Sequence, residues 1–222
     1  MKGVLFDFNG TLVFDSALHE KAWQIFLEKQ TGKKVSHQEL VEHMHGRPNQ
    51  MILEYFLEKT ISPCEAEHLG EEKESIYRNL CQQDNYQLVE GAVEFFAELK
   101  QQEIPFAIAS SSPKPNVDFY FATLPLSQWF DSRNFIYNDG SFAGKPAPDI
   151  YLIAADKIGA NIEECVIFED SPAGILSALN AKPFQVIGIA PTDQDANALS
   201  RQWNIPALCS YCNLTPHTIF SL

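Results

Sequence analysis

Short apolar runs alternate with amphipathic stretches along most of this chain. The runs are rich in β-branched and aromatic residues, and turn residues bound them, which is typical of parallel strands covered on both faces. This alternation predicts an α/β fold, with a Rossmann-like doubly wound parallel sheet. The predicted strands are residues 3–8, 105–109, 134–137, 165–168 and 184–189, and the predicted helices between them are residues 91–102, 115–124, 147–158, 172–180 and 193–203.

One long segment interrupts this alternation. Residues 14–86 contain no convincing strand, and they repeat apolar positions at helical spacing in "SALHEKAWQIFLEK", "SHQELVEHM", "NQMILEYFLEK" and "CEAEHLGEEKESIYRNL". A helical segment of this length is too long for a loop between a strand and the helix that follows it. We therefore expect residues 14–86 to form an all-helical cap domain, and residues 1–13 and 87–222 to form the sheet-containing core.

The composition is that of an ordinary globular protein, with 45% hydrophobic and 20% charged residues. The formal net charge of -13, from 29 acidic and 16 basic residues, argues against nucleic acid or an anionic membrane as the main partner. The start "MKGVLFDF" has no long apolar signal region, and no stretch approaches the roughly 18 uninterrupted apolar residues of a membrane span. We expect a cytoplasmic monomer that acts on a small molecule.

The cysteines do not suggest a framework of disulfides. Cys64, Cys81, Cys165, Cys209 and Cys212 are odd in number and scattered in spacing. The last two form a C-x-x-C motif, but no second pair is present for zinc, and the motif does not start a helix after a strand. Reduced, partly buried thiols are therefore expected.

Polar residues follow several predicted strands at their carboxyl ends. In an open parallel sheet the ligand site lies at these ends, where the strand order reverses. A single strand-terminal Asp or Ser is often only a helix cap, but the whole set in this order indicates one site. The set is Asp7, Asn9, Gly10 and Thr11, then Ser110, Ser111 and Ser112, then the loop Gly144-Lys145-Pro146, and finally Glu169 and Asp170.

These residue types indicate phosphoryl transfer through an aspartate. A carboxylate such as Asp7 would attack phosphorus and form an aspartyl phosphate, which divides one difficult displacement into two easier steps. Because the anionic groups would otherwise repel one another, a divalent cation is needed. Mg²⁺ prefers oxygen ligands, so Asp7, Asp170 and a backbone carbonyl are its expected ligands, with Glu169 among them or just outside them. Ser110 and the amides at a helix start would bind phosphate oxygens, and Lys145 would neutralise their charge.

Four motifs of this chain resemble those of the haloacid dehalogenase (HAD) superfamily, a large class of aspartate-nucleophile phosphatases and mutases. They are "DFNGT" (7–11), "ASS" (109–111), "GKPAPDIY" (144–151) and "EDSPAGILSA" (169–178). Their order and spacing are similar to those of the β-phosphoglucomutase-like branch, which carries a helical cap at the same place. The similarity covers nearly the whole chain, and it is far more specific for fold and site than for substrate.

The resemblance implies a role for each of these residues. Asp7 is the expected nucleophile, Ser110 and Lys145 are expected to bind the transferring phosphoryl group, and the Asn9 carbonyl is expected to help hold Mg²⁺. The catalytic and phosphate-binding set is then Asp7, Asn9, Gly10, Thr11, Ser110, Ser111 and Lys145, and the metal-binding set is Asp7, Asn9, Glu169 and Asp170.

The resemblance also assigns substrate selection to the cap, which closes over the site in the family. The matching positions are His19, Gly46, Arg47 and Lys73. Arg47 is our candidate for binding a second anionic or hydroxyl-rich group of the substrate, and an ordinary surface arginine on a helical cap is the alternative. Packing explains His19 nearly as well as substrate contact, and it explains Trp23 better.

Asn9 departs from the family pattern, in which an Asp usually stands two residues after the nucleophile. That Asp protonates the leaving oxygen and then activates water or a sugar hydroxyl, whereas an asparagine donates a hydrogen bond but transfers no proton. Losing a general acid and base costs about 10²- to 10⁴-fold in rate, so slow turnover is expected. Three explanations stay open: an engineered substitution, a natural variant with attenuated chemistry, or a natural variant whose proton transfers are handled elsewhere.

The most consistent function is a Mg²⁺-dependent phosphatase of small phosphate monoesters, chiefly sugar phosphates. A β-phosphoglucomutase-type mutase is the alternative most damaged by Asn9, because a mutase must also activate a sugar hydroxyl. A pseudoenzyme that binds a phosphorylated ligand without turnover is the alternative from a different class.

Two further HAD chemistries are also open. Metal-free dehalogenases lack the second Asp as well, but Glu169 and Asp170 argue against them, because two acids facing the nucleophile would hinder it without a cation. Phosphonoacetaldehyde hydrolases use a cap lysine as a Schiff base. Lys33, Lys34 and Lys73 are the candidates for that role, although an exposed helical lysine is the usual explanation.

Overall fold

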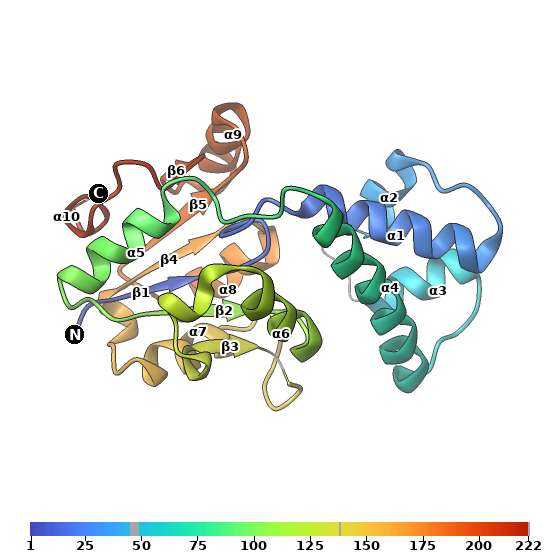
Figure 1. Cartoon of the computed structure of the whole chain (residues 1–222), viewed down its shortest axis with the longest axis horizontal. Coiled ribbons are helices and arrows are strands. Elements are labelled where there is room, and N and C mark those ends of the chain that lie inside the picture. The colour runs from blue at the N-terminus through green and yellow to red at the C-terminus, as the bar shows by residue number, and fades with distance from the viewer. Residues whose placement is uncertain (45–48, 138, 222) are drawn as a thin grey trace. The chain divides into compact units, whose positions relative to one another are not determined.

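The computed structural model describes residues 1–44, 49–137 and 139–221, and its chain divides into two compact units (Figure 1). We call Met1–Phe14 together with Gln87–Leu222 the sheet unit, and Asp15–Tyr86 the helical unit. The sheet unit has the predicted doubly wound α/β fold. The helical unit contains only helices and connections among its described residues, and its role as a cap stays a prediction.

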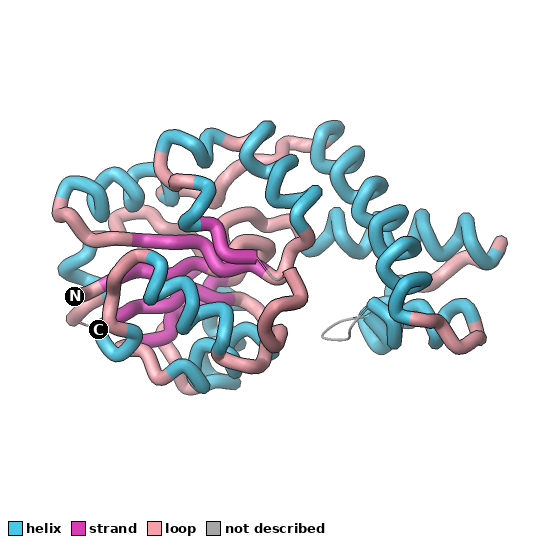
Figure 2. The backbone as a smooth tube through the Cα atoms, turned by 90° about the horizontal axis from the view of Figure 1, so that it is seen from below, coloured by secondary structure: helices cyan, strands magenta, loops and turns pink. Residues whose placement is uncertain are grey.

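The described residues of the sheet unit form a parallel six-stranded sheet in the order β3-β2-β1-β4-β5-β6. Figure 2 shows these strands side by side, with helices on both faces. Because the chain builds the sheet outward from β1 first on one side and then on the other, the strand order reverses beside β1, which is where such sheets bind ligands. The strands are β1 (Gly3–Phe6), β2 (Phe106–Ser110), β3 (Phe135–Tyr137), β4 (Cys165–Glu169), β5 (Gln185–Ile189) and β6 (Ala207–Leu208).

Two strand predictions need correction. The first strand ends at Phe6 rather than at residue 8, because the chain turns at once: the Leu12 amide donates to the Phe8 carbonyl at 2.8 Å, and Gly10 takes a φ of 83°. The strand β6 was not predicted, because two residues are too few to show a period.

The helices of the sheet unit start and end within two residues of their predicted bounds. A short C-terminal helix, α10, and three 3₁₀ turns were not predicted, because they are too short to establish an apolar stripe. The helices are α5 (Ala92–Gln101), α6 (Lys114–Thr123), α7 (Asp149–Lys157), α8 (Pro172–Ala181), α9 (Asp193–Trp203) and α10 (Pro216–Ile219), and the 3₁₀ turns are Pro125–Gln128, Ser132–Asn134 and Ile162–Glu164.

The central strand β1 packs against a different core on each face, because successive side chains of a strand point to opposite sides. Leu5 belongs to an aliphatic core that includes buried residues of α7 and α8. Phe6 belongs to an aromatic core: its ring stacks on Phe168 of β4 at 5.2 Å and meets Phe95 and Phe96 of α5 edge-on at 6.1 and 5.4 Å. Burial on both faces fixes β1, and therefore also the residues that directly follow it.

The helical unit packs around a core of its own. Trp23 is 3% exposed and belongs to this core, as the packing interpretation expected. The last helix begins where Ser62 caps it by accepting a hydrogen bond from the Glu65 amide at 3.3 Å, with Pro63 at the first helical position. The helices are α1 (Ser16–Thr31), α2 (His37–Met44), α3 (Asn49–Leu57) and α4 (Pro63–Gln83).

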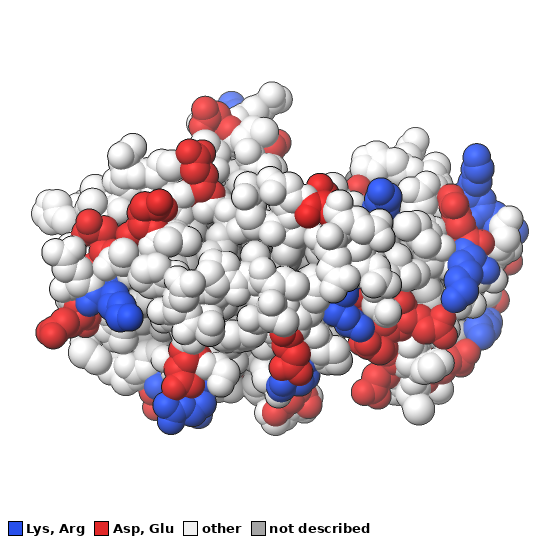
Figure 3. All heavy atoms as spheres, in the orientation of Figure 1, with Lys and Arg blue, Asp and Glu red and all other residues white. Residues whose placement is uncertain are grey.

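The surface agrees with the acidic composition. On the face drawn in Figure 3, acidic and basic side chains are interspersed, and the basic ones form no continuous stripe over the described residues. None of the described helices combines the length and the apolarity that crossing a bilayer requires. Oligomeric state and cellular location stay predictions.

Candidate active site

The carboxyl ends of β1 and β4 bring three acidic residues together. The Asp7 amide donates to the Phe168 carbonyl at 3.0 Å, which ties the first residue after β1 to the neighbouring strand. Asp7, Glu169 and Asp170 each offer a carboxylate oxygen, and these oxygens lie within 4.8 Å of one another. Asp7 and Glu169 are buried, so their charges repel strongly unless cations lie between or beside them.

Lys145 supplies one such cation. Its Nζ donates to Asp7 Oδ1 at 2.5 Å, to Glu169 Oε1 at 2.6 Å and to the Ala109 carbonyl at 3.3 Å, and its side chain is only 7% exposed. Burial alone would lower the pKa of Lys145, but the two carboxylates together outweigh burial and raise that pKa above the usual lysine value. The ammonium group therefore stays charged, as the predicted phosphate-neutralising role requires.

Protein donors engage both oxygens of Glu169. Oε1 accepts from Lys145 and from the Tyr151 hydroxyl, the latter at 2.7 Å. Oε2 accepts from the amides of Asp170 and Ser171 at 2.9 and 3.1 Å, and from the Ser171 hydroxyl at 3.3 Å. Burial first, and then the charge of Glu169, raise the pKa of Tyr151, which stays a neutral donor. Of the two positions predicted for Glu169, this geometry favours the one just outside the metal ligands, where its carboxylate orients Lys145.

Two glycines leave room for the acidic residues. At Gly10, where φ is 83°, an added Cβ would lie 2.1 Å from Asp170 Oδ2. At Gly174 in α8, an added Cβ would lie 1.8 Å from Glu169 Oε1. The motif glycines are therefore needed because carboxylates occupy the space of their missing side chains.

Replacing Gly174 by alanine should lower the free energy of unfolding by about 2 kcal/mol, because a Cβ only 1.8 Å from buried Glu169 Oε1 puts the overpacking cost at the upper end of its range. The higher helix propensity of alanine would stabilise α8 by roughly 1 kcal/mol, but overpacking at a buried site costs typically about 1–3 kcal/mol. Chemical denaturation measures the change. The control is Gly70→Ala in α4, where the new Cβ would come closest, among the described residues, to the Asn49 side chain, at 3.2 Å. A Gly174→Ala protein as stable as the parent would contradict this account of the site.

The remaining predicted phosphate-binding residues differ in their exposure. Thr11 is buried, its hydroxyl donates to Asp170 Oδ1 at 3.3 Å, and its carbonyl accepts from the Tyr211 hydroxyl at 3.2 Å. Ser110 is 1% exposed, and its Oγ accepts from a backbone amide two residues further on, at 3.2 Å. Ser111 is exposed. Ser110 is thus the last residue of β2. Its role in binding phosphate stays a prediction.

The Asn9 side chain is bound by hydroxyl groups. Its Nδ2 donates to Tyr120 Oη at 3.0 Å, and its Oδ1 accepts from Ser112 Oγ at 2.7 Å. Tyr120 and Tyr151 could not be predicted from the polar pattern of the sequence, because an aromatic residue in a helix carries no polar signal. Tyr151 could have been noticed as the last residue of the "GKPAPDIY" motif.

In the helical unit, two candidate substrate residues contact each other. Lys73 Nζ lies 2.9 Å from His19 Nδ1 and donates to Glu74 Oε1 at 2.8 Å, with its side chain only 3% exposed. The His19 ring stacks on Tyr77 with centroids 3.8 Å apart. Burial first, and then the charge of Lys73, lower the pKa of His19, so its neutral ring accepts a hydrogen bond from the ammonium group. The other two candidates, Gly46 and Arg47, lie outside the described residues.

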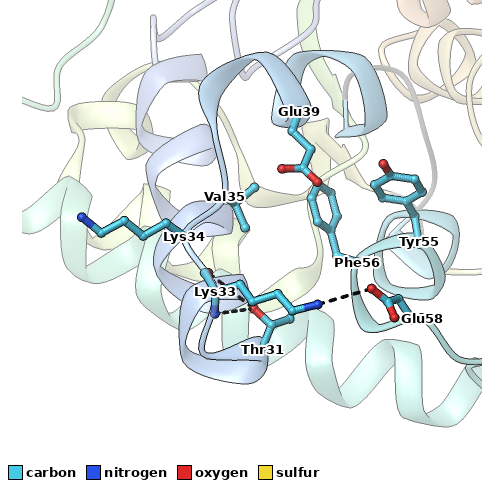
Figure 4. Close-up of a pocket in the computed structure, with 8 residues that line it drawn as sticks. All are labelled: Thr31, Lys33, Lys34, Val35, Glu39, Tyr55, Phe56 and Glu58. Atoms are coloured by element: carbon cyan, nitrogen blue, oxygen red, sulfur yellow. Dashed lines mark hydrogen bonds and ion pairs between the residues drawn. The ribbon is translucent and has the colours of Figure 1, made fainter.

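The other two lysines proposed for Schiff-base chemistry, Lys33 and Lys34, line a pocket of about 330 Å³ in the helical unit (Figure 4). A Schiff-base lysine is normally buried, which favours its neutral and nucleophilic form. Lys33 is instead 75% exposed, with its Nζ 3.5 Å from Glu58 Oε1, and Lys34 is exposed as well. The exposure of Lys33 and Lys34 gives no support to a Schiff-base role for either of them. Lys73 is buried, at 3% exposure, so it remains the candidate for that role. The lining residues are Thr31, Lys33, Lys34, Val35, Glu39, Tyr55, Phe56 and Glu58.

Comparison with known proteins identifies the family of this chain. A model of the haloacid dehalogenase-like hydrolase family matches residues 1–182. The chain belongs to this family. The family resemblance predicted from the four motifs is thereby confirmed, and so is the prediction that the protein is an enzyme of the HAD hydrolase class.

Relatives of this HAD-like hydrolase include both phosphatases and mutases. Hexitol phosphatase A of Escherichia coli is 29% identical over 194 residues, which cover 86% of this chain and 85% of that protein. The β-phosphoglucomutase of Mycobacterium bovis is 26% identical over 223 residues, with 89% and 84% covered. Among solved structures, a family IA, variant 3 HAD hydrolase of Entamoeba histolytica superposes with a TM-score of 0.94 at 39% identity, covering 100% of this chain and 98% of that one.

Proposed function

We propose that this HAD-like hydrolase is a Mg²⁺-dependent phosphatase of small phosphate monoesters, in particular sugar phosphates, and that it forms an aspartyl phosphate on Asp7. The observation that carries the proposal is the bridge from Lys145 to Asp7 and Glu169, at 2.5 and 2.6 Å, beside the Asp170 carboxylate. A buried carboxylate held by a permanent cation is oriented for attack, and the charge of Lys145 is available to phosphate oxygens. The relative named hexitol phosphatase A supports the same reaction class.

The donor set fits Mg²⁺. Asp7 and Asp170 offer carboxylate oxygens near each other, and the Asn9 carbonyl is the predicted third ligand, so all donors are the hard oxygens that this ion prefers. Gly10 keeps the space beside Asp170 open for such an arrangement. When bound, Mg²⁺ would neutralise phosphate oxygens and so reduce the repulsion between the substrate and the nucleophile.

The reaction would proceed in two displacements. An oxygen of Asp7 attacks phosphorus, the bond from phosphorus to the ester oxygen breaks, and its electron pair stays on the departing alcohol oxygen, which takes a proton from water. A water molecule then attacks the same phosphorus and loses its proton to solvent. The bond from phosphorus to Asp7 breaks, which releases inorganic phosphate and restores the carboxylate. Without a carboxyl group at Asn9, solvent must supply and accept both protons, so we expect slow turnover.

In this proposal the helical unit acts as the cap that selects the substrate. His19, Gly46, Arg47 and Lys73 are its proposed contacts. A mutase fits less well, because it would have to deprotonate a sugar hydroxyl with an amide at Asn9.

Hydrolysis of p-nitrophenyl phosphate and acetyl phosphate tests the proposal. We expect hydrolysis that requires Mg²⁺, stops with EDTA and resumes when Mg²⁺ is restored. Reductive trapping of the phosphorylated protein, followed by peptide mapping, should locate the modified residue at Asp7. A screen of sugar phosphates on the faster Asn9→Asp variant would then identify the substrate. Tight binding of a phosphorylated ligand without turnover, in the parent and in Asn9→Asp alike, would replace the phosphatase proposal by a ligand-binding role.

A further inference from the structure

Three polar groups form a closed ring beside the proposed nucleophile. Asn9 Nδ2 contacts Tyr120 Oη at 3.0 Å, Tyr120 Oη contacts Ser112 Oγ at 3.1 Å, and Ser112 Oγ contacts Asn9 Oδ1 at 2.7 Å. We call these three groups the amide ring. They come from three separate places in the chain: the turn after β1, the loop after β2, and α6.

The two hydroxyl-bearing residues are held firmly. Tyr120 is fully buried, and its aromatic ring stacks on Phe8 with centroids 4.2 Å apart. Ser112 is 8% exposed, and its amide donates to Ser110 Oγ at 3.2 Å. Because Phe8 directly precedes Asn9, the same tyrosine packs on one residue and hydrogen-bonds its neighbour. The position of Asn9 is therefore defined by packing and by polar contacts together.

The donors and acceptors of the amide ring balance when residue 9 is an amide. Asn9 Nδ2 donates to Tyr120 and the Ser112 hydroxyl donates to Asn9 Oδ1, so the balance directs the Tyr120 proton to Ser112, and within the ring each group donates once and accepts once. Within the ring, the alternative acceptor for the Tyr120 proton is Asn9 Oδ1, which is further away at 3.4 Å.

A carboxylate would break this balance. An ionised carboxylate only accepts, so both hydroxyls would have to turn toward it, and the 3.1 Å contact between Ser112 Oγ and Tyr120 Oη would lose its hydrogen. The surroundings of Asn9 are thus matched to an amide.

We propose that Tyr120, together with Ser112, is a positioning residue for the hydrolysis reaction. The two hydroxyls hold the Asn9 carboxamide in one orientation, so that this side chain meets the leaving oxygen of the substrate as a fixed hydrogen-bonding group. The inference rests on the proposed phosphatase function. It adds two residues that act through Asn9 without touching phosphorus.

The leaving group separates this role from a structural one. An alkyl alcohol is a poor leaving group and needs hydrogen bonding at its oxygen in the transition state, whereas p-nitrophenolate leaves readily without it. A residue that orients Asn9 should therefore affect an alkyl phosphate much more than an aryl phosphate. A residue that only stabilises the fold should affect both alike.

The test compares kcat and KM for glycerol 2-phosphate and p-nitrophenyl phosphate in Tyr120→Phe, which removes the hydroxyl and keeps the ring. We expect kcat for glycerol 2-phosphate to fall about 3- to 10-fold, the factor that one neutral hydrogen bond contributes, with KM changed less than about 2-fold. For p-nitrophenyl phosphate we expect a change below about 2-fold. Ser112→Ala should give the same pattern, and Ser112→Thr, which keeps the hydroxyl, should restore the parent ratio.

A double-mutant cycle shows whether Tyr120 acts through Asn9. In an Asn9→Ala background there is no carboxamide to orient, so Tyr120→Phe should leave the ratio of the two substrates unchanged within about 2-fold. Independently of turnover, ¹⁵N NMR of the Asn9 side-chain amide should show faster exchange with water in Tyr120→Phe than in the parent.

The outcomes distinguish this inference from the function on which it rests. Equal losses on both substrates, an equal loss in the Asn9→Ala background, or an amide signal that Tyr120→Phe leaves unchanged would each overturn the positioning role while hydrolysis stands. Absence of Asp7-dependent hydrolysis in the parent protein would instead overturn the phosphatase proposal itself.

Discussion

Replacing Asp7 by asparagine should lower Mg²⁺-supported hydrolysis by at least about 10³-fold, because an amide cannot act as the nucleophile that receives phosphorus. The two side chains have nearly the same shape, so the packing after β1 should persist. Lys145 would lose one carboxylate partner and keep Glu169, at 2.6 Å. Initial rates with p-nitrophenyl phosphate, and the incorporation of phosphate into the protein, measure the effect.

A matched control separates loss of the nucleophile from a general effect of the substitution. Asp156 is an exposed residue of α7, so Asp156→Asn makes the same chemical change away from the proposed site and should keep the parent rate. If Asp7→Asn hydrolysed the substrate as fast as Asp156→Asn, the aspartyl-phosphate mechanism would be wrong.

Replacing Asn9 by aspartate should raise kcat for alkyl phosphates by about 10²-fold. A carboxyl group at this position can protonate the leaving oxygen and then accept a proton from the attacking water, which is worth about 10²- to 10⁴-fold. We expect the low end of this range, because the new carboxylate would disrupt the contact between Ser112 and Tyr120. The gain should be smaller for p-nitrophenyl phosphate, whose leaving group needs no proton.

The control for this gain is Asn197→Asp, which places a new carboxylate on an exposed position of α9 and should leave the rate unchanged. The result also separates the third explanation of Asn9, in which other groups handle the proton transfers, from the other two. A gain would indicate that attenuated chemistry is what limits turnover. No gain, in a protein that hydrolyses alkyl phosphates, would mean that other groups already handle the proton transfers.

The sequence was sufficient for the parts of the fold that depend on periodicity and on one topological rule. Runs such as residues 165–168 had to be strands buried on both faces. Because parallel strands end at one edge, Asp7 and Asp170 had to approach each other, as they do. The turn after Phe6 shortened the first strand because Gly10 adopts a left-handed conformation there, which a pattern of apolar residues does not reveal.

The support of the site could not be predicted in the same way. Tyr120 and Tyr151 look like ordinary core aromatics in the sequence, and only tertiary packing places their hydroxyls against Asn9 and Glu169. Lys73 was similarly ambiguous, because "EEKES" has the composition of a solvated helix face. Its burial against Glu74 and His19 depends on how α1 and α4 pack.

The contact of Tyr211 with the turn after β1 has a consequence for protein engineering. The family match ends at residue 182, so the last forty residues look dispensable for a minimal enzyme or a site for fusing another protein. Yet the Tyr211 hydroxyl donates to the Thr11 carbonyl at 3.2 Å, and its amide donates to the Glu90 carbonyl at 2.9 Å. A chain that ends at residue 182 would keep every motif residue. It would lose the buried Tyr211 side chain, which supports the turn that carries the nucleophile.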